Sequence, residues 1–334
     1  MAARLTTYLV VAIVAATLIA GLIVGAQRDD HSGPVDLIIH NGKVHLGDKA
    51  GTVADAVAVR GNKILRVGSE RDVMRRRLPQ TEIVDAKGAA VLPGFADPEA
   101  SLVENGLALA GVDLSGAETI EDVRQRLTDW ADAHPDAAWI TGRGWSASVF
   151  ESPTHTALDL PDDTRPALLL SADGDTAWIN TAAMREARIT RRTAEPDDGE
   201  IVRDRRGNPT GVLKGGAIDL VRARLPQPTA DERAEALRLA IADAHERGVT
   251  TIEDPSASGD DLDVYQDAQK SGDLTLRVNP TVEQRTAVIK PGVPADLVVL
   301  SRAVDNVSAP GVRDTPVEVT VFDGKIVYKR KPTS

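Results

Sequence analysis

The chain contains no cysteine, few aromatic residues and no excess of positive charge. The missing cysteine excludes disulfide bonds, thiolate metal sites, a cysteine nucleophile and a lipid anchor on cysteine. Aromatic residues make up 3% of the 334 residues, so a core must be built mainly from valine, leucine, isoleucine and alanine. The formal net charge of −11 argues against a nucleic-acid partner, which would need a basic face.

Histidine is also scarce, and its placement lacks the pattern of a metal or catalytic site. No two of the six histidines have the spacing of metal ligands, and none follows a nucleophile-elbow motif. A site of the serine–histidine–aspartate type is therefore excluded. The six are His31, His40, His45, His134, His155 and His245.

An uncharged apolar run of 19 residues extends from Tyr8 to Ala26. At about 1.5 Å per residue, a helix of this length spans a bilayer core. We therefore expect residues 1–28 to be a transmembrane signal anchor that binds the lipid bilayer and holds the body outside the cytoplasm, on the periplasmic or cell-surface side. The alternative is a cleaved signal peptide ending near Val24-Gly25-Ala26, which would leave the body secreted. Residues 29–34 then form a polar linker.

Short apolar runs separated by turn signals occur at both ends of the remaining chain. Val35–His40 and Ala56–Val59 are typical of strands, as are Leu297–Leu300 and Val317–Phe322. Two half-sheets at opposite ends of a chain often pair with each other. We expect residues 35–90 and 290–330 to form one composite β-sandwich around an inserted domain.

The middle of the chain, residues 91–289, alternates helix and strand patterns, which indicates a parallel α/β arrangement. The longest helix is expected over Ala230–Arg247, with Thr229 as its N-cap and Gly248 at its end. We count about five strands that could form a barrel wall, whereas a closed barrel needs about eight. The predicted fold class is thus α/β, with an incomplete TIM-like barrel and the small β-sandwich.

A series of short motifs resembles amidohydrolase family 3 of the metal-dependent amidohydrolases. A single motif would be weak evidence, but their order along the chain favours a relationship. They include Val91–Asp97, Gly142–Trp145, Asp173-Gly174, Gly199–Asp204, Pro209–Lys214, Pro291-Gly292, Ala295–Leu300 and Asp323–Tyr328.

The resemblance implies a barrel whose strand ends bind a metal that activates water to hydrolyse C–N bonds. The family's His-x-His positions correspond here to Glu99 and Ser101, and the histidine expected after Asp173-Gly174 is Asp175. Glu253 stands at another position that is often histidine. From Val278 the chain reaches the closing Pro291-Gly292 motif within about a dozen residues, so the segment that would carry the later ligands and the aspartate base is missing. These departures predict a degenerate hydrolytic centre.

Carboxylates could still gather at the ends of neighbouring strands. An oxygen-only cluster would suit a divalent cation such as Ca²⁺, Mg²⁺ or Mn²⁺, although we expect no cofactor. The alternative is a set of hydrogen-bonded or solvated acids. The candidates are Asp97, Glu99, Asp173, Asp175, Glu253 and Asp254.

Two further sets of residues leave alternatives open. Trp139, Trp145 and Trp178 are interpreted as core anchors, with a ligand pocket as the alternative. Lys214 could serve as a charge partner for the acids. The preferred functional hypothesis is a non-catalytic binding, scaffold or accessory subunit of a membrane complex. The strand edges and apolar faces that an incomplete barrel exposes would be covered by a partner or by self-association. The alternatives are a metal-dependent hydrolase acting on amide-like C–N bonds and a small-ligand receptor.

Overall fold

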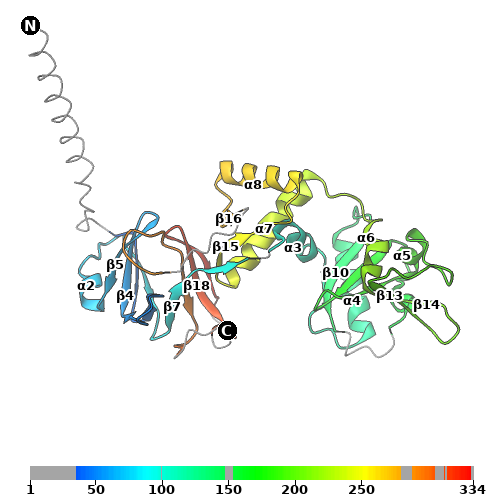
Figure 1. Ribbon diagram of the computed structural model, residues 1–334, viewed down its shortest axis with the longest axis horizontal. Helices are drawn as coiled ribbons and strands as arrows, with labels where there is room; N and C mark the ends of the chain where they lie inside the picture. Colours follow the sequence, from blue (N-terminus) through cyan, green and yellow to red (C-terminus); the bar gives the residue numbers. More distant parts are fainter. Residues whose placement is uncertain are drawn as a thin grey trace, which may run out of the picture. The chain divides into compact units, whose positions relative to one another are not determined.

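The computed structural model describes residues 35–98, 100–146, 153–279, 288–304, 312 and 314–331 (Figure 1). Contacts divide the chain into two compact units, Met1–Gly94 with Arg285–Ser334, and Phe95–Gln284. The predicted membrane segment Tyr8–Ala26 lies outside the described residues. In the part that is described, none of the helices combines the length and hydrophobicity that a bilayer crossing requires. The anchor therefore stays a prediction.

The first unit consists of two sheets that share one hydrophobic core. A four-stranded sheet has the order β5-β4-β1-β6, and a six-stranded sheet has the order β19-β18-β17-β7-β2-β3. The two ends of the chain meet in the second sheet, where β17 pairs antiparallel with β7. The elements are β1 (Leu37–His40), β2 (Lys43–His45), β3 (Val53–Ala54), β4 (Ala56–Arg60), β5 (Lys63–Gly68), α2 (Glu70–Met74), β6 (Glu82–Asp85), β7 (Ala90–Pro93), β17 (Leu297–Leu300), β18 (Val317–Phe322) and β19 (Lys325–Lys329).

Residue alternation explains how this unit fills two cores. In β4, Val57 and Val59 enter the core between the sheets, whereas Ala56 and Ala58 face the other way, into a small core shared with Val73 of α2. Alternate side chains of a strand point to opposite faces, so a strand covered on both sides is apolar throughout. The short alanines leave room for the helix.

The second unit contains two separate sheets. Three parallel strands form one sheet in the order β16-β15-β8, and six strands form the other in the order β13-β14-β12-β11-β10-β9. The elements are β8 (Phe95–Asp97), α3 (Leu102–Leu109), β9 (Val112–Asp113), α4 (Ile120–Ala133), β10 (Ile140–Trp145), η1 (His155–Leu158), β11 (Ala167–Ser171), β12 (Thr176–Ile179), α5 (Thr181–Glu186), β13 (Gly199–Arg203), β14 (Pro209–Gly215), η2 (Gly216–Ile218), α6 (Asp219–Arg222), α7 (Ala230–Glu246), β15 (Val249–Glu253), α8 (Gly259–Ser271) and β16 (Arg277–Asn279).

The six parallel strands of this unit occur as two groups of three. β8, β15 and β16 run parallel to one another, as do β9, β10 and β11. Beyond β11, antiparallel pairing takes over through β12, β14 and β13. The described residues therefore build parallel barrel-type strands without a closed wall of eight.

The Val91–Asp97 motif is divided between the two units at Gly94. Residues before it belong to β7 of the first unit, and Phe95 begins β8 of the second. The Gly94 N–H donates to the Asp296 carbonyl at 2.9 Å, and the Phe95 N–H donates to the Gly248 carbonyl at 3.0 Å. The boundary lies after Gly94, rather than before Val91 as expected, because β7 pairs with strands of the sandwich.

Two of the three tryptophans singled out in the sequence lie fully buried in one core. Trp145 and Trp178 make an edge-to-face contact with ring centroids 5.6 Å apart. Their indole N–H groups donate to the carbonyls of Leu169 and Thr154, each at 2.9 Å. Trp139 is partly buried against a neighbouring core. Aromatic pairs of this kind anchor a core through area and geometry together.

His245 on α7 should make the stability depend on pH. Its ring is buried, and its Nε2 donates to the Thr275 carbonyl at 2.9 Å. Burial lowers the pKa of His245, partly opposed by that hydrogen bond. The unfolded chain then takes up the proton more readily than the folded protein, so protonation favours unfolding. The free energy of unfolding should therefore be highest above the ordinary histidine pKa of about 6.5 and fall as the pH drops below it.

Chemical denaturation between about pH 7.5 and pH 5.5 would measure this dependence. A His245→Gln variant retains an N–H donor for Thr275 but does not titrate, so its stability should fall less over the same range. Burial also lowers the pKa of His45, so a residual slope is expected. Equal slopes for wild type and variant would contradict the assignment.

Candidate functional site

The carboxyl ends of β8 and β15 place several sequence candidates side by side. Asp97 is the last residue of β8 and pairs in register with Ile252 of β15. Glu253 ends β15 and is paired with Asn279 of β16. In parallel α/β folds, ligands bind outside the carboxyl ends of the strands, so this edge is the place to look for chemistry.

Asp254, directly after β15, is buried and accepts four hydrogen bonds. Its Oδ2 accepts from the Tyr265 hydroxyl at 2.6 Å and from the Leu102 backbone N–H at 3.1 Å. Its Oδ1 accepts from the hydroxyl and the N–H of Ser256, at 2.9 and 3.2 Å. Burial, followed by the contact with Asp254, raises the pKa of the Tyr265 hydroxyl, which keeps its proton and acts as the donor. The carboxylate is saturated by the protein itself.

The Leu102 contact makes Asp254 the cap of α3. Ser101 occupies the N-cap position, but its side chain makes no capping hydrogen bond. Its hydroxyl instead lies 2.9 Å from the hydroxyl of Ser256. An acceptor at a helix N-terminus satisfies an otherwise unpaired N–H and interacts favourably with the helix dipole. Ser101, at the second of the His-x-His positions, is thus engaged with the same loop that Asp254 orders.

Glu253 differs from its neighbour. Its carbonyl accepts from the Ala100 N–H at 3.0 Å, but its Oε2 is buried and has no hydrogen-bond partner among the described residues. A buried, unpaired carboxylate oxygen is costly and is unusual in a native structure. Glu99, the first of the His-x-His positions, lies outside the described residues.

Asp173 and Asp175 lie on the other sheet, in the exposed turn between β11 and β12. Asp173 Oδ1 accepts from the Ser171 hydroxyl at 2.5 Å and from the Asp175 N–H at 3.2 Å. These hydrogen bonds, the hydroxyl first, lower the pKa of Asp173. Lys214, considered as a charge partner for the acids, forms an ion pair with Glu200 across the β13–β14 hairpin at 2.9 Å.

The six candidate carboxylates therefore do not form one cluster among the residues that can be placed. Within the described ranges, no three or more histidine, aspartate or glutamate side chains are grouped so that they could hold a metal ion. Asp254 is saturated by four donors, and Ser101 is a neutral hydroxyl bonded to another. The strand-end residues that the structure describes do not fit the metal centre of the resembled family.

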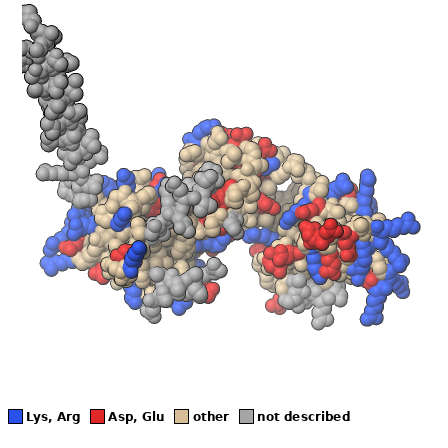
Figure 2. All heavy atoms as spheres, viewed as in Figure 1, with Lys and Arg blue, Asp and Glu red and all other residues tan. Residues whose placement is uncertain are grey.

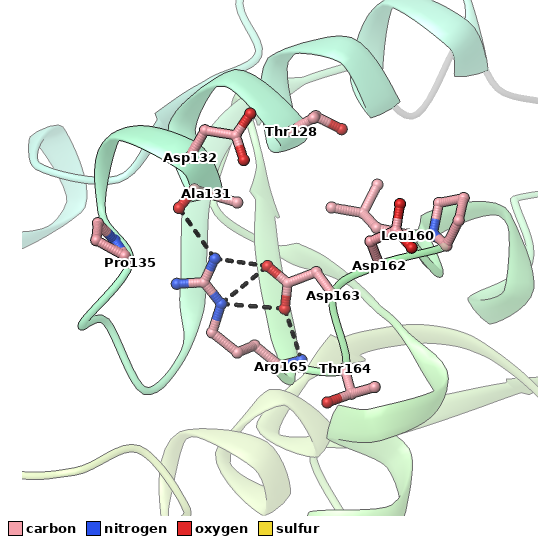
Figure 3. Close-up of a pocket in the computed structure, with 10 residues that line it drawn as sticks. Thr128, Ala131, Asp132, Pro135, Leu160, Asp162, Asp163, Thr164 and Arg165 are labelled. Carbon is pink, nitrogen blue, oxygen red and sulfur yellow. Dashed lines mark hydrogen bonds and ion pairs between the residues drawn. The ribbon is translucent and has the colours of Figure 1, made fainter.

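A cavity of about 460 Å³ lies elsewhere in the second unit, between the end of α4 and the segment before β11 (Figure 3). Arg165 is one of the residues that line the cavity. Its guanidinium pairs with Asp163 and donates to the carbonyls of Ala131, His134 and Ala137. The same guanidinium lowers the pKa of Asp163.

This cavity was not predicted from the sequence. Its lining residues are Thr128, Ala131, Asp132, Pro135, Leu160, Pro161, Asp162, Asp163, Thr164 and Arg165. The only signal in the sequence was the charged turn Asp162–Arg165 ahead of an apolar strand, which is typical of many solvent-exposed loops.

Comparisons with known proteins agree with the motifs. A model of the amidohydrolase family matches residues 82–287. The chain is 33% identical over 221 residues to Protein LONG AFTER FAR-RED 3 of Arabidopsis thaliana, covering 66% of this chain and 38% of that protein. It is 32% identical over 249 residues to the putative amidohydrolase YtcJ of Bacillus subtilis, covering 72% and 47%.

A third relative is the N-substituted formamide deformylase of Arthrobacter pascens, 30% identical over 248 residues, covering 72% of this chain and 46% of the enzyme. The matched part thus spans less than half the length of each of these relatives. Among solved structures, an uncharacterized metal-dependent hydrolase from Pyrococcus furiosus matches with a TM-score of 0.50 at 22% identity, covering 72% of this chain and 49% of that one. That likeness concerns the fold alone.

Proposed function

This chain belongs to the amidohydrolase family, and we propose that it has lost the family's hydrolytic centre and acts as a binding or accessory protein at a membrane. The observation that carries the proposal is that Asp254 and Ser101 are engaged in hydrogen bonds within the protein. Asp254 holds Tyr265, Ser256 and the first turn of α3 together, and Ser101 is bonded to Ser256. A carboxylate whose oxygens already accept four hydrogen bonds from the protein is poorly suited to bind a metal as well.

The membrane part of the proposal rests on the uncharged segment Tyr8–Ala26. A segment of that length would hold the body at a bilayer surface, where an accessory subunit acts. Within the residues that the structure describes, the barrel-type strands do not close a wall, which adds a reason for a partner, because natural proteins cover exposed strand edges.

A second candidate function is a metal-dependent hydrolase of amide-like C–N bonds. The observation that favours it is the buried Oε2 of Glu253, which no residue of the described ranges satisfies and which a cation would. The deformylase among the relatives is an enzyme of that chemical class by its name. On this alternative, Glu253 would be a ligand.

One experiment separates the two candidates. The full chain is purified in detergent without chelator, its divalent metal content is measured, and turnover of an N-substituted formamide is assayed for wild type and Glu253→Gln. We expect no stoichiometric metal and no turnover in either protein. One bound divalent ion per chain, lost together with turnover in Glu253→Gln, would establish the hydrolase instead.

A further inference from the structure

Five exposed arginines project together from the second unit. Arg188, Arg191 and Arg192 lie in the loop after α5, and Arg205 and Arg206 lie in the turn between β13 and β14. We call these five the arginine tip. Figure 2 shows blue atoms gathered over this end of the unit. The only acid within the loop Arg188–Thr193 and the turn Asp204–Asn208 is Asp204, so the tip is strongly positive in a chain of net charge −11.

A sixth arginine fastens the two segments to each other. The guanidinium of Arg203 donates to the carbonyls of Thr190 and Gly207, both at 3.3 Å, and to that of Thr193 at 2.8 Å. Arg203 also forms an ion pair with Glu195 at 3.6 Å. These hydrogen bonds of Arg203 explain why the two segments lie side by side although β13 separates them in the sequence.

Each segment is also ordered within itself. In the turn, Asp204 Oδ1 accepts from the N–H groups of Arg206 and Asn208, each at 2.8 Å. In the loop, the Thr193 N–H donates to the Thr190 carbonyl at 3.1 Å, and the Thr190 N–H donates to the Thr193 hydroxyl at 2.8 Å. The backbone that carries the tip is therefore fixed before any partner arrives, which lowers the entropic cost of binding.

The tip itself is not neutralised. None of its five guanidinium groups forms an ion pair with a residue that the structure describes, whereas Arg203 behind them does. Planar guanidinium groups bind phosphate oxygens through paired N–H donors. Five of them spread over two segments match an extended layer of phosphates better than a single small anion.

The sequence around the tip also separates a lipid surface from a nucleic acid. No phenylalanine, tyrosine or tryptophan occurs between Trp178 and Tyr265, so no aromatic ring of this segment could stack on bases. The remaining net-negative surface would be repelled by a long polyanion that wraps around the unit. We propose that the arginine tip docks on the headgroups of an anionic bilayer, an inference that rests on the proposed membrane attachment through Tyr8–Ala26.

The tip arginines are themselves trypsin sites, so protection from trypsin reports docking at the tip and not attachment elsewhere. The full chain is mixed with phosphatidylcholine vesicles, with or without phosphatidylglycerol, and cleavage rates at Arg192 and Arg206 are followed by mass spectrometry. We expect protection of both sites with phosphatidylglycerol and normal cleavage without it. A basic residue near an anionic surface strengthens binding by about 5-fold. Protection is the ratio of the cleavage rate without phosphatidylglycerol to the rate with it, and this ratio should fall on the order of 10-fold or more in an Arg191→Gln/Arg205→Gln variant.

The matched control is Arg71→Gln/Arg77→Gln, which removes the same charge from exposed positions in and just after α2 of the first unit. It should retain the protection of the tip. Equal cleavage on both vesicle types, or equal loss of protection in the two variants, would overturn the proposal. Stronger protection by a DNA oligonucleotide than by the anionic vesicles would also overturn it, in favour of a nucleic acid.

Vesicle flotation in the same samples tests the attachment separately. If the segment Tyr8–Ala26 holds the chain, it should float with both vesicle types whatever the tip does. If that attachment is wrong but the tip docks, the chain should float only with phosphatidylglycerol and still show protection.

Discussion

Replacing Asp254 by alanine should lower the free energy of unfolding by about 3 kcal/mol or more. The change removes an acceptor of four hydrogen bonds and leaves the Tyr265 hydroxyl and the Leu102 N–H without a partner in a buried setting. A buried donor left unpaired costs about 1–3 kcal/mol, and the first turn of α3 loses its cap at the same time. Urea denaturation followed by circular dichroism would measure the loss.

The adjacent Glu253 provides the matched control. Its Oε2 is buried with no hydrogen-bond partner in the described part of the chain, so Glu253→Gln removes a buried charge without breaking a hydrogen bond to this oxygen. The substitution should be close to neutral or stabilising, within about 1 kcal/mol, because burying an uncompensated charge is costly. Asp254→Asn should fall between the two, because its amide oxygen keeps one acceptor, whereas its NH₂ group is a donor and cannot accept from the other pair of donors.

These three variants also bear on function. If Asp254→Ala left stability unchanged but abolished metal binding or turnover, the carboxylate would be serving chemistry and the proposed loss of the hydrolytic centre would be wrong. We expect instead that Asp254→Ala lowers the stability and that there is no metal binding or turnover for it to abolish.

Local patterns in the sequence sufficed for elements that carry their own start and stop signals. Thr229 and Gly248 bracket the longest helix, and the structure gives α7 as Ala230–Glu246 with a capping box between Thr229 and Glu232. The β13–β14 hairpin follows from its turn at Arg206–Pro209 in the same way. Such signals act over a few residues, so they are visible without tertiary contacts.

The family resemblance likewise could be read from the sequence, because it depends on ordered short motifs, and the family model confirms it. What could not be predicted depends on distant partners. α3 (Leu102–Leu109) is short, and the acceptor that caps it is Asp254, 152 positions away. The division at Gly94 arises because β7 finds its partner in β17, near the other end of the chain.

The same limit applies to the candidate site. The sequence identified the residues at the strand ends, but it did not reveal which of them are saturated. Asp254 and Glu253 are adjacent acids after one strand, and only their neighbours in space distinguish a fully bonded carboxylate from one with a buried, unpaired oxygen. The periodicity of apolar residues and the amino-acid composition carry no information about that difference.

The second large effect is expected at Gly106, where α3 crosses α7. A Cβ at this position would lie 1.8 Å from the backbone carbonyl oxygen of Ala236, which is far inside a van der Waals contact. In an open helix, alanine stabilises relative to glycine by up to about 1 kcal/mol. Here the two helices must separate, so Gly106→Ala should instead destabilise the protein by about 2 kcal/mol or more.

Gly259, at the start of α8, is the control because it has open space around it. Apart from the chain neighbours and the helix's own backbone, no described atom lies within 4 Å of a Cβ placed there, so Gly259→Ala should be neutral or stabilise by up to about 1 kcal/mol. Opposite signs for two helical Gly→Ala substitutions, measured by urea denaturation, would establish that close backbone packing makes the difference. A gain in stability at both positions would refute the close approach of α3 to α7.

Gly106 and Asp254 act on the same helix, which allows a sharper test. Asp254 fixes the first turn of α3, and Gly106 lets the helix lie against α7. If both hold α3 in place, the double variant should lose less stability than the two single losses added, because a helix already displaced by the Gly106→Ala substitution has no cap left to lose. Coupled residues show such deviations of about 0.5–3 kcal/mol, whereas independent sites add. Strict additivity would mean that the carboxylate stabilises the loop around Ser256 and Tyr265 alone, and that the start of α3 does not depend on it.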